Sequence, residues 1–284
     1  MRRSRGYILP LALVLIALSG AALAKICRQN MRAALASTDD CRQLQHKWGM
    51  LSCQSVALAN AGALLSAVSG QTSAVPPSLE LELSLGGHQY RLRLSDEQAK
   101  VNLNMLYHAR GRPETERFVG AAARAARGLG PISLRPMHFY GENNGSAATM
   151  AMRFGSFGQV FKDSGSVGDA KAIMQATRSF TCWGDGKLDY RHASPIEIAA
   201  LAGNDPKLLK TILTRKSQPA AAALAFNPLN FQDRNGKNLD DLFTETSNCF
   251  SVWIVVDDGT ESQVTFCVRE FGRDGRGHLT YLSW

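Results

Sequence analysis

The most constraining feature of this 284-residue chain is an uncharged apolar segment near its start, Tyr7–Ala24, which follows Arg2, Arg3 and Arg5. As a helix this segment would be about 27 Å long, close to the roughly 30 Å hydrocarbon thickness of a bilayer. The basic residues ahead of it favour a cytoplasmic location for that end of the helix. The sequence therefore predicts one membrane-spanning helix, with the rest of the chain on the far side of the membrane.

Two processing routes are compatible with such a segment. A secretory signal peptide would be cut after Ala24 and would release a soluble protein. In the other route the apolar helix is kept, and only the basic leader is removed, between Gly6 and Tyr7. The sequence that follows favours the second route, because no proline occurs from Lys25 to about Leu65 and the helical pattern continues.

Residues 79–94 consist of two runs of alternating apolar and polar residues on either side of Gly86-Gly87. Two glycines between such runs indicate a two-residue hairpin turn, because these turns need positive φ angles. The turn fixes a register in which Leu83 faces Tyr90 on an apolar side. On the other side the predicted charged pairs are Glu82 with Arg91 and Glu80 with Arg93.

The order of the remaining patterns predicts the architecture. Residues 239–284 have the pattern of a three-stranded meander, with turns at Asp257–Ser262 and Arg273–Gly277. Residues 111–238 are mostly helical in pattern, and Ser194, followed by a proline and then a glutamate, has the spacing of a capping box. We therefore expect an α+β fold, in which a long helix packs on an antiparallel sheet that is interrupted by an inserted helical domain.

A short basic leader ending in Gly6, an uncharged helix directly behind it and an amphipathic continuation resemble the type IV pilin and pseudopilin superfamily. Most members carry Glu at the fifth mature position, where this chain has Leu11. The member that characteristically lacks this Glu is minor pseudopilin K of type II secretion, the general secretion pathway protein K family. Two further stretches resemble that family. They are an acidic pair, a lysine and spaced asparagines (Asp96, Glu97, Lys100, Asn102 and Asn104) and a run that enters a helix (Gly186, Lys187, Leu188, Ala193, Ser194, Pro195 and Ile198).

The second of these stretches departs from the family pattern at three positions. Asp189, Arg191 and His192 stand where the family has two Asn and a Thr. This leaves open how the chain would replace any polar network carried by those amides. We interpret His192, beside Ser194, as part of the helix entry and not as half of a nucleophile pair.

The resemblance implies both the parts of the chain and its role. The implied parts are a leader (1–6), a transmembrane and amphipathic helix (7–72), the first part of a pilin-like sheet (73–110), an inserted helical domain (111–238) and the strands that complete the sheet (239–284). Prepilin peptidase would cut after Gly6 and methylate Tyr7. The product would be a single-pass protein of the bacterial inner membrane with its body in the periplasm.

The implied role is that of a minor pseudopilin, which caps the tip of the periplasmic pseudopilus and helps to initiate its assembly. That fibre serves the export of folded proteins across the outer membrane. The implied partners are the other minor pseudopilins, of the I and J types, and the major pseudopilin.

Calcium is also implied by the resemblance, because the family binds it in the helical insert through loop carboxylates. Closely spaced oxygen ligands on loops that contain glycine suit Ca²⁺. The candidate ligands are Asp185 with Asp189, and the cluster Asp233, Asn235, Asn238, Asp240 and Asp241. Neither group has EF-hand spacing, and Asp and Asn are also ordinary turn residues, so both interpretations stay open.

The chain has six cysteines but no Cys-x-x-Cys pair, which argues against a zinc ribbon. Cys41 and Cys53 lie on one predicted helix, about 18 Å apart along its axis, so they cannot bond to each other. In an oxidising compartment a disulfide is expected among Cys182, Cys249 and Cys267. The sequence leaves open which pair forms.

Composition and motifs argue against two other classes of protein. The 32 Lys and Arg residues exceed the 24 Asp and Glu residues, but the two signs are interspersed, so we expect no nucleic-acid partner. The chain contains no His-Glu-x-x-His helix, Gly-x-Ser-x-Gly elbow or phosphate-binding glycine loop, so we expect no enzyme. Two alternatives remain: a soluble secreted binding protein released after Ala24, and a periplasmic enzyme with its active site in the helical insert.

Overall fold

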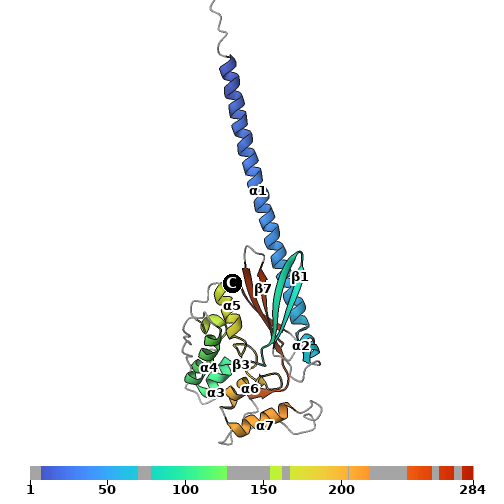
Figure 1. The fold of residues 1–284 in the computed structure, drawn as a ribbon, viewed down its shortest axis with the longest axis vertical. Coiled ribbons are helices and arrows are strands. Elements are labelled where there is room, and N and C mark those ends of the chain that lie inside the picture. The colour runs from blue at the N-terminus through green and yellow to red at the C-terminus, as the bar shows by residue number, and fades with distance from the viewer. Residues whose placement is uncertain are drawn as a thin grey trace, which may run out of the picture. The chain divides into compact units, whose positions relative to one another are not determined.

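The computed structural model describes residues 8–69, 78–126, 154–161, 167–203, 205–217, 242–257, 262–271 and 277–283. The chain divides into two compact units, residues 1–50 and 51–284. The described part of the first unit is the greater part of helix α1 (Ile8–Ala59) (Figure 1). Three of the predicted part boundaries, after residues 6, 72 and 238, lie outside the described residues.

Helix α1 passes without interruption through the apolar segment and beyond it. It is the one helix in the described ranges that is long and apolar enough to cross a membrane, with a window of mean hydropathy 2.1 that is not buried at all. Pro10 is compatible with the helix because a proline in the first turn lacks only an N–H that would have no helical partner. The predicted continuation of the helix past Ala24 is confirmed.

The second unit is built on a five-stranded antiparallel sheet, with the strands in the order β1-β2-β7-β8-β9. The C-terminal meander is confirmed, because β7, β8 and β9 pair in sequence order. The helical region lies between β2 and β7, so it is an insertion into the sheet. The strands are β1 (Ser78–Leu85), β2 (His88–Asp96), β7 (Cys249–Asp257), β8 (Ser262–Phe271) and β9 (Gly277–Ser283).

The hairpin β1–β2 has the register that the sequence predicts. Leu83 lies opposite Tyr90, and Glu82 lies opposite Arg91. Gly86 and Gly87 both have positive φ, at 59° and 82°, which is the conformation that the two-residue turn requires. The α+β fold, with a long apolar helix and an antiparallel sheet carrying a helical insertion, is therefore the one expected from the sequence.

The sheet has a hydrophobic core on each face. On one face, buried Leu92, Ile254 and Cys267 lie on the side of α2 (Ala61–Ser69). A Cβ at Gly62 of α2 would lie 3.8 Å from the Phe250 ring. Figure 1 shows α2 on one side of the sheet and α5 on the other. The apolar residues of α1 and α2 buried in the second unit are Cys53, Ala57, Leu58, Ala61 and Leu65.

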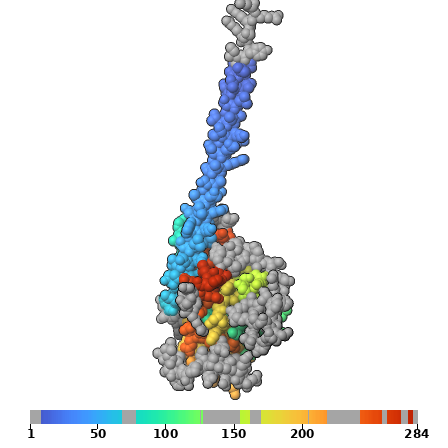
Figure 2. All heavy atoms as spheres, turned by 180° about the vertical axis from the view of Figure 1, so that it is seen from behind, coloured from blue at the N-terminus to red at the C-terminus, as the bar shows by residue number. Residues whose placement is uncertain are grey.

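The inserted region contributes short helices and two small parallel strand pairs. The helical pattern predicted for residues 111–238 is found as α4, α5, α6 and α7, whereas α3 and the strand pairs β3–β4 and β5–β6 were not predicted. In Figure 2 the C-terminal strands (red) lie between the light-blue end of the N-terminal helical segment and the yellow helical region. The elements are β3 (Val101–Asn102), α3 (Leu103–Arg110), α4 (Arg112–Ala125), η1 (Phe157–Gln159), α5 (Val167–Ala176), β4 (Phe180–Thr181), β5 (Leu188–Asp189), α6 (Pro195–Ala202), α7 (Pro206–Lys216) and β6 (Phe243–Thr244).

An aromatic cluster joins the insertion to the sheet. Phe157, in η1, is almost fully buried, and its ring centroid lies 4.6 Å from that of Trp183 and 5.4 Å from that of Phe266 in β8. Trp253 of β7 is 6.3 Å from Phe157 and 4.8 Å from Phe266. The second face of the sheet is thus covered by the inserted helices through these rings.

Candidate functional site

Three segments that are far apart in the sequence meet beside the end of β2. We call this region the polar junction, and it comprises residues 96–104, 182–192 and 245–251. It contains the acidic pair, the lysine and the two asparagines that the sequence analysis singled out. Its fully or almost fully buried polar side chains are Asp96, Glu97, Gln98, Lys100, Asn102, Asp189 and Ser251.

The ion pair between Glu97 and Lys100 lies at the centre of the junction. Lys100 Nζ is 2.5 Å from Glu97 Oε1, and the two side chains are 4% and 0% exposed. Ser251 of β7 donates a hydrogen bond to the same carboxylate oxygen, at 2.5 Å. The Glu97 backbone N–H donates to the carbonyl of Cys249 at 2.9 Å. These contacts fasten the segment after β2 to the central strand of the sheet.

The two asparagines hold the start of α3 against the segment around Trp183. Asn102 caps α3 by accepting from the N–H groups of Asn104 and Met105, and its Nδ2 donates to the Trp183 carbonyl at 2.7 Å. Asn104 Nδ2 donates to the carbonyls of Phe154 and Cys182, both at 3.2 Å. Side-chain amides are suited to this role because each offers both donors and an acceptor.

Asp96, Asp189 and His192 form a second charged group in the junction. His192 Nδ1 lies 2.8 Å from Asp189 Oδ2 and 3.2 Å from Asp96 Oδ2. The carboxylates of Asp189 and Asp96 raise the pKa of His192 to about 10, because both stabilise the protonated ring. The ring is therefore an imidazolium at neutral pH, held between two buried carboxylates.

Glu245 is the centre of a third group, on the other side of β5. Its carboxylate accepts from the Tyr190 hydroxyl and from Arg191 and Arg215, each of which has a guanidinium nitrogen at 3.3 Å. Burial and the hydrogen bond to Glu245 raise the pKa of Tyr190 to about 12. At the positions where Asp189, Arg191 and His192 depart from the family pattern, this chain thus has a network of ionic contacts.

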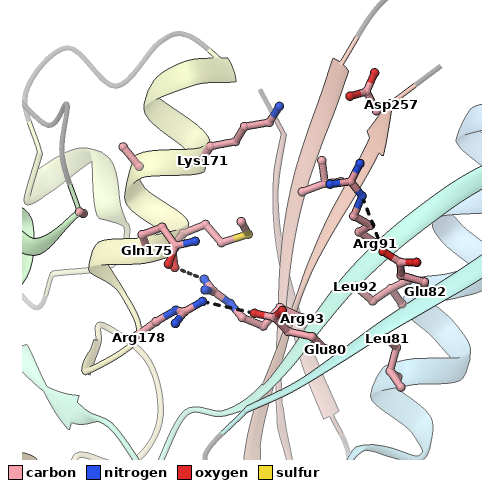
Figure 3. A pocket seen from close by; sticks show the side chains of 14 residues that line it. Glu80, Leu81, Glu82, Arg91, Leu92, Arg93, Lys171, Gln175, Arg178 and Asp257 are labelled. Atoms are coloured by element: carbon pink, nitrogen blue, oxygen red, sulfur yellow. Dashed lines mark hydrogen bonds and ion pairs between the residues drawn. The ribbon is translucent and has the colours of Figure 1, made fainter. Parts of the chain in front are cut away.

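A groove of about 800 Å³ lies between α5 and the strands β1, β2 and β7 (Figure 3). Glu80 lies opposite Arg93 in the register, as predicted, but its carboxylate is 3.3 Å from Arg178. Arg93 instead donates to the carbonyl of Met174, and burial lowers its pKa to about 10. Because the walls carry charges of both signs, the groove differs from the mostly apolar cavities typical of small-molecule sites.

Comparisons with known proteins give similarities to solved structures. No protein-family model and no curated protein matches the sequence. The structure aligns with a chain in the crystal structure of the GspK-GspI-GspJ complex from the enterotoxigenic Escherichia coli type 2 secretion system. The TM-score is 0.49 at 14% identity, and the alignment covers 87% of this chain and 99% of that chain. A match of this degree does not assign a function by itself.

The calcium candidates divide into two groups. Asp185 Oδ1 accepts from Gln98 Nε2 at 2.7 Å and from the Lys187 N–H at 2.9 Å. Asp189 converges with Asp96 and His192 instead, a set containing a nitrogen donor that does not fit the all-oxygen preference of calcium. Asp233, Asn235, Asn238, Asp240 and Asp241 lie outside the described residues, so calcium binding stays a prediction.

The three disulfide candidates are buried thiols. In the β7–β8 register Cys249 lies opposite Glu270, and Cys267 lies opposite Val252. The two cysteines are three positions out of register and project from opposite faces of the sheet, so they cannot bond to each other. Burial raises the pKa of Cys182 and Cys249, and that of Cys267 to about 12. A disulfide that includes Cys182 stays a prediction.

Two further sequence-based expectations concern the processing site and His192. Gly6 and Tyr7 lie outside the described residues. The pairing of His192 with Asp96 was not predicted, because the two residues are 96 positions apart and no local pattern connects them. Only the family-like character of both stretches could have indicated that they meet.

The capping box at the start of α6 is confirmed, and we expect Ser194→Ala to destabilise the protein by about 0.5–2 kcal/mol. Ser194 accepts from the Ile196 N–H, and Glu197 Oε2 accepts from the Ser194 N–H at 2.9 Å. Removing the hydroxyl leaves a backbone donor of the first turn without its partner. Urea unfolding measures the effect. The control Ser217→Ala, at the exposed C-cap of α7, should change stability by less than about 0.5 kcal/mol. Equal effects of the two variants would contradict this prediction.

Proposed function

We propose that this chain is a minor pseudopilin of the type II protein secretion system, of the K type. The observation that carries the proposal is the continuity of α1. One helix extends from the apolar segment, past Ala24, to Ala59, and its last residues contribute to the core of the folded body. A signal peptide that is removed after Ala24 would not need to continue as the helix on which the sheet packs.

In the proposed mechanism the chain acts mechanically and has no catalytic activity. Prepilin peptidase removes the leader after Gly6 and methylates Tyr7, while the helix remains in the inner membrane with the body in the periplasm. The apolar helix then packs against helices of the I-type, J-type and major pseudopilins as the fibre forms. The helices inserted between β2 and β7 add bulk to the body, which prevents another subunit from stacking above it and leaves this subunit at the tip.

The residue at the fifth mature position supports the tip location. Leu11 has no carboxylate with which to meet the N-terminal amine of a subunit already in the fibre. Such a contact is not needed by a subunit that starts the fibre and stays at its end. This proposal also gives the subunit a part in initiating assembly.

The decisive experiment is the intact mass of the protein isolated from its own membranes. We expect a membrane-bound chain that begins at methylated Tyr7. Gly6→Leu should keep the whole leader, because the peptidase needs a small residue before the cut. Ala24→Leu should be processed like the unaltered chain, since no cleavage occurs there.

A soluble protein that begins at Lys25, and whose release is blocked by Ala24→Leu, would sink the pseudopilin proposal and favour the secreted binding protein. Secretion provides a second readout. Deletion of the gene should stop export through the type II system, and the full chain should restore it. Gly6→Leu should fail to restore export although the protein is present in the membrane.

A further inference from the structure

We propose that Asp96, Asp189 and His192 form a binding site for one divalent transition-metal ion of the Zn²⁺ class. This site goes beyond the proposed pseudopilin function. The donors come from three places: Asp96 at the end of β2, Asp189 in β5, and His192 in the turn that leads to α6. Their ligand atoms all lie within 4.8 Å of one another.

The distances between the ligand atoms fit such an ion. His192 Nδ1 is 2.8 Å from Asp189 Oδ2 and 3.2 Å from Asp96 Oδ2. Bonds from Zn²⁺ to nitrogen and oxygen ligands are about 2.0–2.2 Å long, so the ligand atoms of a tetrahedral site are about 3.4 Å apart. An ion can therefore bind between these atoms with only small movements of the three side chains.

Each carboxylate is held through its other oxygen atom, so that Oδ2 faces the histidine. Asp96 Oδ1 accepts from the Gln98 N–H at 2.9 Å and from Ser247 Oγ at 2.5 Å. Asp189 Oδ1 accepts from the Arg191 N–H at 3.0 Å. Hydrogen bonds of this kind, made by partners behind the ligands, orient metal-binding carboxylates in known sites.

An independent observation indicates that a cation belongs here. Asp189 is fully buried, and its Oδ2 has an ion-pair contact with His192 but no aligned hydrogen-bond donor among the residues that the structure describes. A buried carboxylate oxygen without a donor is costly. An ion bound between the three side chains would be the partner of this oxygen, and any proton on His192 Nδ1 would leave to solvent as the ion binds.

The donor set selects the class of metal. Calcium takes six to eight oxygen ligands, whereas imidazole nitrogen suits Zn²⁺, Fe²⁺, Ni²⁺ and Cu²⁺. The His192 side chain is 32% exposed, so an ion can enter from that side and water can complete its coordination. The site therefore shares Asp189 with one predicted calcium site but differs from it in the metal and in the other two ligands, Asp96 and His192.

The test is a titration of the full-length, metal-free protein in detergent with ZnCl₂, followed by calorimetry and thermal unfolding. We expect one Zn²⁺ per chain and a higher Tm, and this rise should be lost in His192→Asn. Any rise with CaCl₂, from the predicted calcium sites, should be the same in His192→Asn as in the unaltered chain. His192→Asn and Asp189→Asn should each weaken Zn²⁺ binding at least about tenfold. The matched control His278→Asn, at an exposed histidine of β9, should leave binding unchanged.

Two further measurements separate this site from adventitious binding to the cysteines. Ser247→Ala removes a hydrogen bond to Asp96 but no ligand, so it should weaken binding about tenfold while the stoichiometry stays at one. Bound Co²⁺ should show d–d absorption bands without a thiolate charge-transfer band. Unchanged Zn²⁺ binding in His192→Asn, a thiolate band, or a Ca²⁺-dependent Tm rise that His192→Asn abolishes would each overturn the proposal. If Asp189→Asn fails to fold, His192→Asn, at a partly exposed side chain, decides the question.

Discussion

Replacing Lys100 with methionine should lower the free energy of unfolding by about 3–5 kcal/mol. Lys100 and Glu97 are an ion pair with almost no solvent exposure, and Ser251 and the Cys249 carbonyl are the other partners of Glu97. Methionine keeps most of the volume of the lysine but leaves the Glu97 carboxylate buried without a cation. Urea unfolding of the full-length protein in detergent, followed by tryptophan fluorescence, measures the loss.

Two comparisons show whether burial of the charge is the cause. The double variant Glu97→Gln/Lys100→Met removes both charges, and it should recover much of the lost stability because the amide can still accept from Ser251. Glu116→Gln removes one partner of the exposed pair with Arg112, where Arg112 Nε lies 2.7 Å from Glu116 Oε1. It should leave stability nearly unchanged, since water solvates both side chains. A loss in Lys100→Met no larger than that in Glu116→Gln would refute this account.

The sequence was most informative where a local rule determines the structure. Gly86-Gly87 defines a two-residue turn, and the side chains of a strand alternate between faces, so the entire β1–β2 register could be derived, including Leu83 opposite Tyr90. The capping box at Ser194 is equally local, since all its contacts lie within four residues. The uninterrupted α1 follows from the absence of proline after the first turn.

The polar junction could not be derived in this way. Asp96 and His192, and also Glu97 and Ser251, are far apart in the sequence, and their contacts depend on how the insertion folds back onto the sheet. From the sequence, Asp189 was a calcium candidate and His192 was interpreted as part of the helix entry, and neither interpretation predicted their contact with Asp96. The register between β7 and β8 could not be derived from the sequence either. The turn between these strands is longer than two residues, so it did not determine that Cys249 lies opposite Glu270.

Helix α3 was not predicted from the sequence for a different reason. It is only eight residues long, from Leu103 to Arg110, and it begins directly after the short strand β3. The side chain that caps it, Asn102, was noted in the sequence for its resemblance to a family motif and not as a helix start. A short helix of this kind is stabilised mainly by its packing and its cap. Leu103 and Leu106, both buried, supply the packing.

Phe157→Ala should cost about 3–5 kcal/mol of stability, because it opens a cavity among large rings. Phe157 lies within 6.3 Å of Trp183, Trp253 and Phe266, measured between ring centroids, and these residues join the insertion to the sheet. Since both tryptophans border the cavity, their near-UV circular dichroism should weaken, while the far-UV signal of the long helix is kept. Phe250→Ala, at a half-buried ring on the other face of the sheet, should cost less and leave the tryptophan signal intact.

If the two alanine variants lost equal stability, or if the tryptophan signal of Phe157→Ala were unchanged, the cluster would not be what holds the insertion against the sheet. In that case the bulk proposed to block stacking at the fibre tip would need another anchor.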